Sequence, residues 1–397
     1  MVFGIHDTMR FSERTHDVID SFIMKLISVS KEEGMISFAT GLPDERLFDI
    51  SGIAEASASL FEDKDEAKNA LQYGTVKGIL PLRKKIASRC RKEMNFNVNE
   101  ENIFIVNGSQ ECFDLAGKMF IDRGDVMISD NPGYLGALQS FSAYGPEIIG
   151  VQMNSDGPDS RQLRDALKKD PKLYYSIPNH QNPSGISYSH DKRKEVAEML
   201  SSSDCIMLED DAYGELGYNG RAGPPVRSMT DNVIFTGSFS KVISPGMRLG
   251  WMIVPDEMRD ITTKFIESSS LHANTFSQNI MNRYLEMNDL DAYLRRIRNE
   301  YKRKSRLMLD LMEDHLSPEL SWNEPNGGMF ILLRLKEGYD AMELFNSALK
   351  KKLVVMPGRP FHISGGENTI RLNFATADDE NIKEGVRRLA DAYQGLF

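Results

Sequence analysis

The chain has 397 residues, of which 41% are hydrophobic and 27% are charged, and its formal net charge is −10. This length suits two domains, and the composition is that of a globular protein. The acidic balance and the lack of a basic stripe argue against a nucleic-acid surface, and no apolar run reaches the length that spans a membrane.

Strand-like apolar runs alternate with amphipathic helices from about residue 102 to residue 255. This alternation is typical of a parallel sheet covered by helices. Open sheets of this kind bind ligands beyond the carboxyl ends of their strands. The residues that follow each predicted strand are therefore the candidates for a binding site.

The first such turn, Asn107-Gly108-Ser109-Gln110, joins the run 102–106 to a predicted helix over 109–121. At the start of a helix, the backbone N–H groups of Ser109 and Gln110 can face a phosphate. Serine is also an ordinary N-cap, so the motif fits a plain helix start as well.

Tyr134 and Asn182 follow the next two strand-like runs, 126–128 and 173–177. Tyr134 can lie flat on a bound aromatic ring, or it can fill a packed turn. Asn182 belongs to a turn rich in Pro and Gly, where an amide can point at a ligand.

The run 205–208 ends in Glu209-Asp210-Asp211, with Tyr213 close behind. Three adjacent acids fit a solvated turn, a divalent-metal site or a carboxylate that binds a cationic ring nitrogen. No second acidic cluster with ligand spacing and no histidine pair stands out in the sequence, so we expect no metal site.

The most informative turn follows the run 233–235 and reads Gly237-Ser238-Phe239-Ser240-Lys241, with Arg248 downstream. A lysine in this setting suits a Schiff base with a phosphorylated aldehyde, whose phosphate Ser238, Ser240 and Arg248 can hold. Taken alone, the segment also fits an exposed loop with a solvated lysine.

Pyridoxal 5'-phosphate is the predicted cofactor, because other strand ends supply the contacts that it needs. Asp210 can keep the pyridine nitrogen protonated, so that the ring withdraws electrons from the substrate. Tyr213 can donate its phenol hydrogen to the ring oxygen.

A second module follows the sheet. A long charged helix begins near residue 291, strands are predicted over 329–335, 353–356 and 369–374, and a last helix begins at residue 378. Together with residues 1–51, residues 291–397 are expected to form a small domain beside a large domain of residues 52–290.

Nine motifs run through the chain in a fixed order: Ser37–Pro43, Leu71–Gly74, Asn107–Gln110, Gln181–Gly185, Glu209–Tyr213, Gly237–Lys241, Gly327–Phe330, Met356–Gly358 and Thr369–Leu372. This set closely resembles the fold-type I pyridoxal-phosphate enzymes of the class I/II aminotransferases, and among them the kynurenine and 2-aminoadipate aminotransferase group. The resemblance implies an α/β fold, with a large domain built on a mostly parallel seven-stranded sheet and a smaller α/β domain.

The resemblance also implies a role for each cofactor-site residue. Lys241 bonds to the cofactor and shuttles the substrate α-proton, Asp210 pairs with the ring nitrogen, and Asn182 and Tyr213 bond the ring oxygen. Tyr134 stacks on the ring. The residues implied to cradle the phosphate are Ser109, Gln110, Ser238, Ser240 and Arg248.

Substrate binding and assembly follow from the same resemblance. Arg371 is implied to clamp the substrate α-carboxylate, with Gly41 and Asn182 beside it; its planar fork then fixes which α-bond stands perpendicular to the ring. Taken alone, Arg371 fits a surface ion pair. Tyr73 is implied to reach the phosphate of the neighbouring subunit, which requires a homodimer with shared active sites.

The implied activity is a ping-pong transfer of an amino group from an L-amino acid to 2-oxoglutarate. Thr40 stands where the group usually has glycine, and His180 where it usually has an aromatic residue. In the helix 18–25, Met24, with Lys25 adjacent, occupies a position where aminoadipate-using relatives can carry arginine. This favours aromatic or large apolar donors over a strict dicarboxylate, although 2-aminoadipate stays open.

Two other functions use this fold. A pyridoxal-phosphate lyase or decarboxylase shares the cofactor site, but Arg371 favours keeping the carboxylate and breaking the C–H bond. A transcription regulator places a helix-turn-helix domain ahead of the fold, and this sequence has only a short predicted helix before Ser37. Cys90, Cys112 and Cys205 show no paired spacing and no signal peptide is evident, so we expect a cytoplasmic enzyme.

Overall fold

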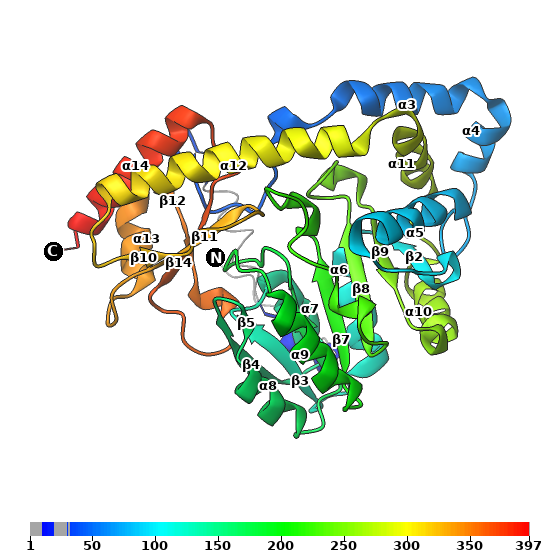
Figure 1. Ribbon diagram of the computed structural model, residues 1–397, viewed down its shortest axis with the longest axis horizontal. Helices are drawn as coiled ribbons and strands as arrows, with labels where there is room; N and C mark the ends of the chain where they lie inside the picture. The colour runs from blue at the N-terminus through cyan, green and yellow to red at the C-terminus, as the bar shows by residue number, and fades with distance from the viewer. Residues whose placement is uncertain (1–9, 20–29, 31, 397) are drawn as a thin grey trace.

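The computed structural model describes residues 10–19, 30 and 32–396. Met24 and Lys25, the predicted side-chain specificity positions, lie outside the described residues. The described chain forms three sheets, and the largest has the strand order β2-β9-β8-β7-β6-β3-β4-β5 (Figure 1). Its strands are β2 (Ile103–Val106), β3 (Val126–Asn131), β4 (Glu147–Asn154), β5 (Gly157–Pro158), β6 (Leu173–Ser176), β7 (Ile206–Asp211), β8 (Val233–Ser238) and β9 (Gly250–Ile253).

The predicted α/β class and the mostly parallel sheet are confirmed. Strands β4, β3, β6, β7 and β8 pair in parallel, whereas β9 and β5 run against their neighbours. The sheet has eight strands rather than the seven expected. The additional strand, β5, is a two-residue hairpin partner of β4 that turns back at Gly157 (φ +133°), and it is too short to show a periodic pattern.

Both faces of the large sheet are covered by helices. Neighbouring residues of each strand point to opposite sides, as the alternation of strand side chains requires. On one side, Ile128, Tyr174 and Met207 belong to a core with α8 (Ser160–Leu167) and α9 (His190–Ser201). On the other side, Met127, Tyr175 and Leu208 belong to the main core, which includes α6 (Ser109–Phe120) and α7 (Leu135–Ser142). Burial on both faces explains why these strands read as continuous apolar runs.

The C-terminal part forms a second sheet with its own helices. Its strands β10 (Ser321–Trp322), β11 (Phe330–Arg334), β14 (Thr369–Asn373) and β13 (Met356–Pro357) are all antiparallel. The helices of this end are α12 (Leu290–His315), α13 (Ala341–Lys350) and α14 (Asp379–Gln394), and Figure 1 shows α12 as the long yellow helix that runs from this end toward α3 and α11.

The N-terminal segment joins this second unit. Strand β1 (Ile36–Ser37) pairs in parallel with β12 (Leu353–Val354), so residues far apart in the sequence share one small sheet. This pairing agrees with the expected make-up of the small domain, whose boundaries at residues 51 and 290 stay a prediction. The remaining described helices are α1 (Arg14–Asp17), α3 (Ile50–Glu62), α4 (Lys64–Leu71), α5 (Leu80–Met94), α10 (Arg259–Ser270) and α11 (Thr275–Met287).

Two kinds of feature that bear on function are absent from the described residues. Across residues 10–19, 30 and 32–396, no helix combines the length and apolarity needed to cross a bilayer. The same residues contain no group of three or more His, Cys, Asp or Glu side chains placed to hold a metal ion.

A substitution at Gly237 tests how tightly the sheet packs near the end of β8, just before Lys241. The indole of Trp251 lies over this glycine, and a Cβ atom there would stand 2.2 Å from Trp251 Cζ2. We expect Gly237→Ala to lower the free energy of unfolding by about 1–3 kcal/mol, because the buried ring has to move. Urea denaturation measures this.

Gly246→Ala is the matched control. At Gly246 the nearest atom to a new Cβ is Ser244 Oγ at 3.8 Å, an ordinary contact. Equal losses of stability in the two variants would show that the Trp251 contact is not the cause.

Candidate active site

Most of the predicted site residues lie at the carboxyl ends of β7 and β8 or in the segments that follow β2, β3, β6, β7 and β8. β14, in the second sheet, adds Arg371, and the segment after β1 adds Gly41. Contacts join these pieces: Arg371 Nη1 donates to Asn182 Oδ1 at 3.0 Å, and Lys241 Nζ donates to the Gly41 carbonyl at 3.0 Å. The candidate site therefore lies between the large sheet and the second unit.

Lys241 follows β8 and points at the 39–41 backbone. Burial lowers the pKa of its ammonium to about 8, and the nearby cations Arg371 and Arg248 act in the same direction, against the opposing charge of Asp210. A lysine with this pKa has an appreciable share of free amine near neutral pH, which is the form that attacks an aldehyde or takes a proton.

Asp210 lies at the end of β7 and is buried. Its Oδ2 accepts the hydroxyl of Tyr175 at 2.9 Å, and Oδ1 lies 3.5 Å from Thr236 Oγ1. Burial raises the pKa of Asp210 to about 7, although the Tyr175 hydrogen bond opposes this. A carboxylate that is buried at this cost suits a cationic partner such as a protonated ring nitrogen.

Arg371 is 2% exposed and lies between two phenyl rings, with its guanidinium carbon 4.6 Å from the centre of Phe330 and 5.0 Å from that of Phe361. It donates to Asn182 and to the Ala39 carbonyl, and its Nε has no hydrogen-bond partner among the described residues. Burial lowers the pKa of Arg371 to about 10, so it stays charged at neutral pH.

Within the described part of the chain, no carboxylate forms an ion pair with Arg371. A buried cation whose partners are only an amide and a carbonyl fits a site for an anionic ligand, because burying an unpaired charge is costly. The planar fork of a guanidinium matches a carboxylate in particular.

Arg248 and the start of α6 form the other end of the site. Helix α6 is preceded by Gly108 (φ +85°), which brings no side chain to cap it, so its first N–H groups are open to an anion. Arg248 Nη2 donates to the Asn107 carbonyl at 3.2 Å. A Cβ at Gly108 would stand 2.6 Å from Arg248 Nη2, so only glycine lets the guanidinium lie here.

Three hydrophilic residues accompany this end. Ser238 is buried and its Oγ accepts the backbone N–H of Ser240 at 3.0 Å, so both hydroxyl-bearing residues lie in one tight turn. The Gln110 side chain donates to the Gly136 carbonyl at 2.9 Å. The backbone N–H groups of Ser109 and Gln110 belong to the uncapped first turn of α6, where a phosphate can bind.

Tyr213 and Asn182 meet over the site, with Asn182 Nδ2 donating to the Tyr213 hydroxyl at 3.4 Å. Tyr134 follows β3 and packs edge-on against Phe113, with ring centres 6.2 Å apart. Their contacts to a cofactor ring stay predictions.

Tyr73 is placed differently. The residue is 77% exposed, and its ring packs perpendicular to that of His272, with the ring centres 5.8 Å apart. Among its described contacts none is with the site residues of its own chain, which is what a role across a subunit interface requires.

The two departures from the usual motifs are both buried. Thr40 accepts the Asn373 amide through its carbonyl at 2.5 Å. His180 adopts φ +48°, and its Nδ1 lies 3.1 Å from Ser187 Oγ. Burial lowers the pKa of His180 to about 3, so the ring is neutral and acts as a packed side chain at ordinary pH.

Sequence reasoning missed several residues that shape the site. Tyr175 and Thr236 support Asp210, and Phe330 and Phe361 enclose Arg371. Tyr175, Thr236 and Phe330 lie in strand-like runs, where they look like core, whereas Phe361 lies in the short helix η7 (Arg359–Phe361), in a segment rich in Gly and Pro. Tyr175 alone had a position that pointed to the site, because it lies near the end of β6, the strand that pairs with β7.

Pyridoxal phosphate fits the residues that are present. The site offers an amine of lowered pKa at Lys241, a buried carboxylate at Asp210, an uncapped helix start beside Arg248 and, at Arg371, a buried guanidinium that no described carboxylate neutralises. These match, in turn, an aldehyde, a ring nitrogen, a phosphate and a substrate carboxylate.

Comparisons with known proteins agree with this chemistry. The family model described as aminotransferase class I and II matches residues 33–389. The chain is 35% identical to "Aromatic-amino-acid aminotransferase 1" of Thermococcus litoralis, over 96% of this chain and 93% of that protein.

Two solved structures are similar over nearly their whole length. The alpha-aminoadipate aminotransferase of Thermus thermophilus, complexed with N-(5'-phosphopyridoxyl)-L-leucine, has a TM-score of 0.90 at 35% identity and 97% coverage of both chains. The kynurenine aminotransferase of Pyrococcus horikoshii has a TM-score of 0.92 at 32% identity, with 98% of this chain and 97% of that chain covered.

The lowered pKa of Lys241 has a measurable consequence. Only the free amine reacts with an aldehyde, so the rate at which the apoprotein takes up pyridoxal phosphate should rise about tenfold per pH unit below pH 8 and level off above it. Stopped-flow absorbance measures this rate. In Arg371→Gln the midpoint should move to higher pH, because a neighbouring positive charge is removed.

A profile that keeps rising up to the ordinary lysine range, with no difference between the two proteins, would contradict this account of Lys241. Lys264→Ala, which changes an exposed lysine of α10, serves as the control for uptake elsewhere on the surface.

Proposed function

The chain belongs to the class I and II aminotransferases, a family of pyridoxal-phosphate enzymes, and on that premise we propose that it carries the amino group of a large L-amino acid to 2-oxoglutarate with Lys241 as its proton-transfer group. The reaction is a transamination of the ping-pong type. One observation supports the roles most directly: the short segment Ala39–Gly41 contacts both Arg371 and Lys241 through its carbonyls.

Arg371 and Lys241, the two residues that contact this segment, are proposed to have different roles. Arg371, with Asn182 beside it, is proposed to bind the α-carboxylate of the amino acid as a fork. Holding the carboxylate fixes the α-carbon, so that its C–H bond faces Lys241 and the C–C bond to the carboxylate lies away from it. Lys241 Nζ would then take the α-proton and deliver it to the carbon of the bound cofactor that carried the aldehyde, and the second half-reaction would run this transfer in reverse.

The remaining residues are proposed to hold and tune the cofactor. Pyridoxal phosphate supplies an aldehyde that accepts the amino group and a ring that withdraws electrons from the α-carbon. Asp210 keeps the proton on the ring nitrogen, and Tyr213 and Asn182 donate to the ring oxygen. Tyr134 covers the ring. The residues proposed for the phosphate are Ser109, Gln110, Ser238, Ser240 and Arg248.

The donor class is proposed from the names of the relatives, which act on aromatic amino acids, alpha-aminoadipate or kynurenine. All three share an α-amino acid head with a long or bulky side chain. Arg371 would bind the head, whereas Met24 and Lys25, the positions predicted to contact the side chain, lie outside the described residues.

A spectrum of the purified protein tests the function. Adding an amino acid without acceptor should remove the visible absorbance of the bound cofactor, and 2-oxoglutarate should restore it, because each half-reaction runs alone. Phenylalanine, kynurenine, 2-aminoadipate, leucine and methionine form the donor panel. Lys241→Ala should lower the rate of the half-reaction by about 10³-fold or more.

Lys264→Ala, on the exposed face of α10, should react like the unaltered protein. A cofactor spectrum that no donor changes would reject transamination, and normal rates in Lys241→Ala would reject the role given to that lysine.

We further propose a homodimer with shared active sites. The support is a set of exposed apolar side chains on α3, α4 and the segments next to them, namely Ile50, Phe61, Leu71, Tyr73 and Leu271. Exposed apolar surface of this kind is typical of a subunit interface. The phenol of Tyr73 would then reach the phosphate bound by the partner subunit.

Hybrid dimers test this assignment. Tyr73→Phe should weaken cofactor binding, because one hydrogen bond to the phosphate is lost, by about tenfold. A hybrid of one Lys241→Ala subunit and one Tyr73→Phe subunit then contains one site with both residues intact, and half of its sites should regain unaltered affinity. A hybrid without any high-affinity site would place Tyr73 in its own subunit's site.

A further inference from the structure

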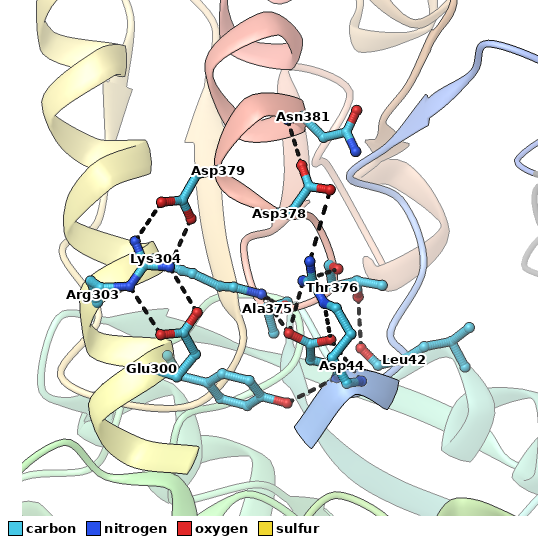
Figure 2. Close-up of polar contacts among 12 residues, drawn as sticks. Leu42, Asp44, Glu300, Arg303, Lys304, Ala375, Thr376, Asp378, Asp379 and Asn381 are labelled. Atoms are coloured by element: carbon cyan, nitrogen blue, oxygen red, sulfur yellow. Dashed lines mark hydrogen bonds and ion pairs between the residues drawn. The ribbon is translucent and has the colours of Figure 1, made fainter. Parts of the chain in front are cut away.

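A buried ion pair joins α12 to the segment in front of the active site. Lys304 of α12 is 1% exposed and Asp44 is 3% exposed, and Lys304 Nζ lies 2.6 Å from Asp44 Oδ2. Lys304 also donates to the Ala375 carbonyl at 2.7 Å, as Figure 2 shows. The lysine thus links three segments: α12, the residues around Asp44 and the turn after β14.

Asp44 is held from other directions as well. Arg46 donates to both carboxylate oxygens, from Nε to Oδ1 at 2.8 Å and from Nη2 to Oδ2 at 2.9 Å, and its backbone N–H donates to Oδ1 at 3.1 Å at the start of the short helix η1 (Glu45–Leu47). The backbone N–H of Asp44 donates to the Tyr301 hydroxyl at 3.1 Å, one turn before Lys304 on α12. Residue 44 is therefore fixed through both its main chain and its side chain.

The residues just before Asp44 contact the reacting groups. We call residues 39–44 the 39–44 loop. The Ala39 carbonyl accepts from Arg371 and the Gly41 carbonyl from Lys241. On its inner side, Asn373 Nδ2 donates to the Thr40 carbonyl at 2.5 Å and to the Leu42 carbonyl at 3.3 Å. The loop is thus anchored in its middle by Asn373 and Thr376, and Lys304 is the buried charged contact among those that hold its end at Asp44.

Stability alone does not account for a lysine in this place. A buried ion pair gives little or no net stabilisation compared with apolar side chains of the same size, because both charges lose their hydration. What it does provide is a directional contact, which fixes the position of the carboxylate along one line.

We propose that Lys304 is a positioning residue: by holding Asp44 it fixes the 39–44 loop, and so keeps the Ala39 carbonyl on Arg371 and thereby sets the affinity of the enzyme for the substrate carboxylate. The inference rests on the proposed function of Arg371. The Ala39 carbonyl is one of the two hydrogen-bond acceptors of the guanidinium, and a loop displaced by about 1 Å loses that contact and misaligns the fork.

Four variants test this. Lys304→Met and Asp44→Asn each remove one end of the pair, and the double variant removes both, so that no unpaired charge stays buried. Arg303→Met is the matched control: it is the next residue of α12 and loses an ion pair of its own with Glu300 and Asp379, but that pair is exposed and does not touch the loop (Figure 2).

The measurements are the dissociation constant of 2-oxoglutarate from the cofactor-loaded protein, the donor half-reaction and the melting temperature. We expect the dissociation constant and the half-saturating donor concentration to rise about tenfold in all three pair variants, while the limiting rate changes less than about threefold. The double variant should equal the single ones, because both ends act through one contact. Arg303→Met should match the unaltered protein.

If a single variant fails to fold, the double variant decides the test. Unaltered affinity in the folded double variant, even with a lowered melting temperature, would mean that the pair is only structural and would overturn the proposal. An unaltered protein that transaminates none of the donors would instead overturn the proposed function, which separates the two failures.

Discussion

The whole site depends on keeping two like charges, Arg371 and Lys241, in one buried place. Burial lowers the pKa of both, to about 10 for the arginine and about 8 for the lysine, and the charge of the arginine contributes to the lowering at the lysine. Because a guanidinium starts from a much higher pKa than an ammonium, the same environment leaves Arg371 charged while it brings Lys241 within reach of deprotonation. On the proposed roles, the same surroundings would thus yield an anion binder and a base from two cationic residues.

The two like charges are brought together from different sheets. Lys241 follows β8 of the large sheet and Arg371 lies in β14 of the second sheet. The 39–44 loop lies between them and offers its carbonyls to both. A rigid sheet on each side places each residue within its own unit, whereas their separation depends on how the loop and α12 join the units. This is why the Asp44–Lys304 pair, although it touches neither reacting group, lies on the path that sets the geometry of the site.

The sequence predicted those site residues that come at the ends of strands. Lys241, Asp210 and Asn182 stand just beyond apolar runs, and such positions converge at one edge of a parallel sheet. Arg371 was predicted from its family motif and not from a strand-end position, since it lies within β14 of the second sheet. The sequence indicated no role for Phe330, which belongs to a motif but looks like core at the start of a strand, or for Phe361, which lies in a Gly- and Pro-rich segment without a strand pattern. Nor did it indicate the Asp44–Lys304 pair, whose members are 260 positions apart, or the two-residue strand β5.

The enclosure of Arg371 bears on which reaction the site favours. Enzymes that share this cofactor differ in the α-bond they break, and that choice depends on the orientation of the substrate rather than on the contacts to the cofactor. Two phenyl rings and two acceptors hold the guanidinium in one plane, while its Nε has no partner in the described part of the chain. A carboxylate bound to that plane is itself fixed and stabilised as an anion, which opposes its loss as carbon dioxide. On the roles proposed for Arg371 and Lys241, the same contact would turn the C–H bond toward Lys241, so that the residues around Arg371 would favour transamination over decarboxylation.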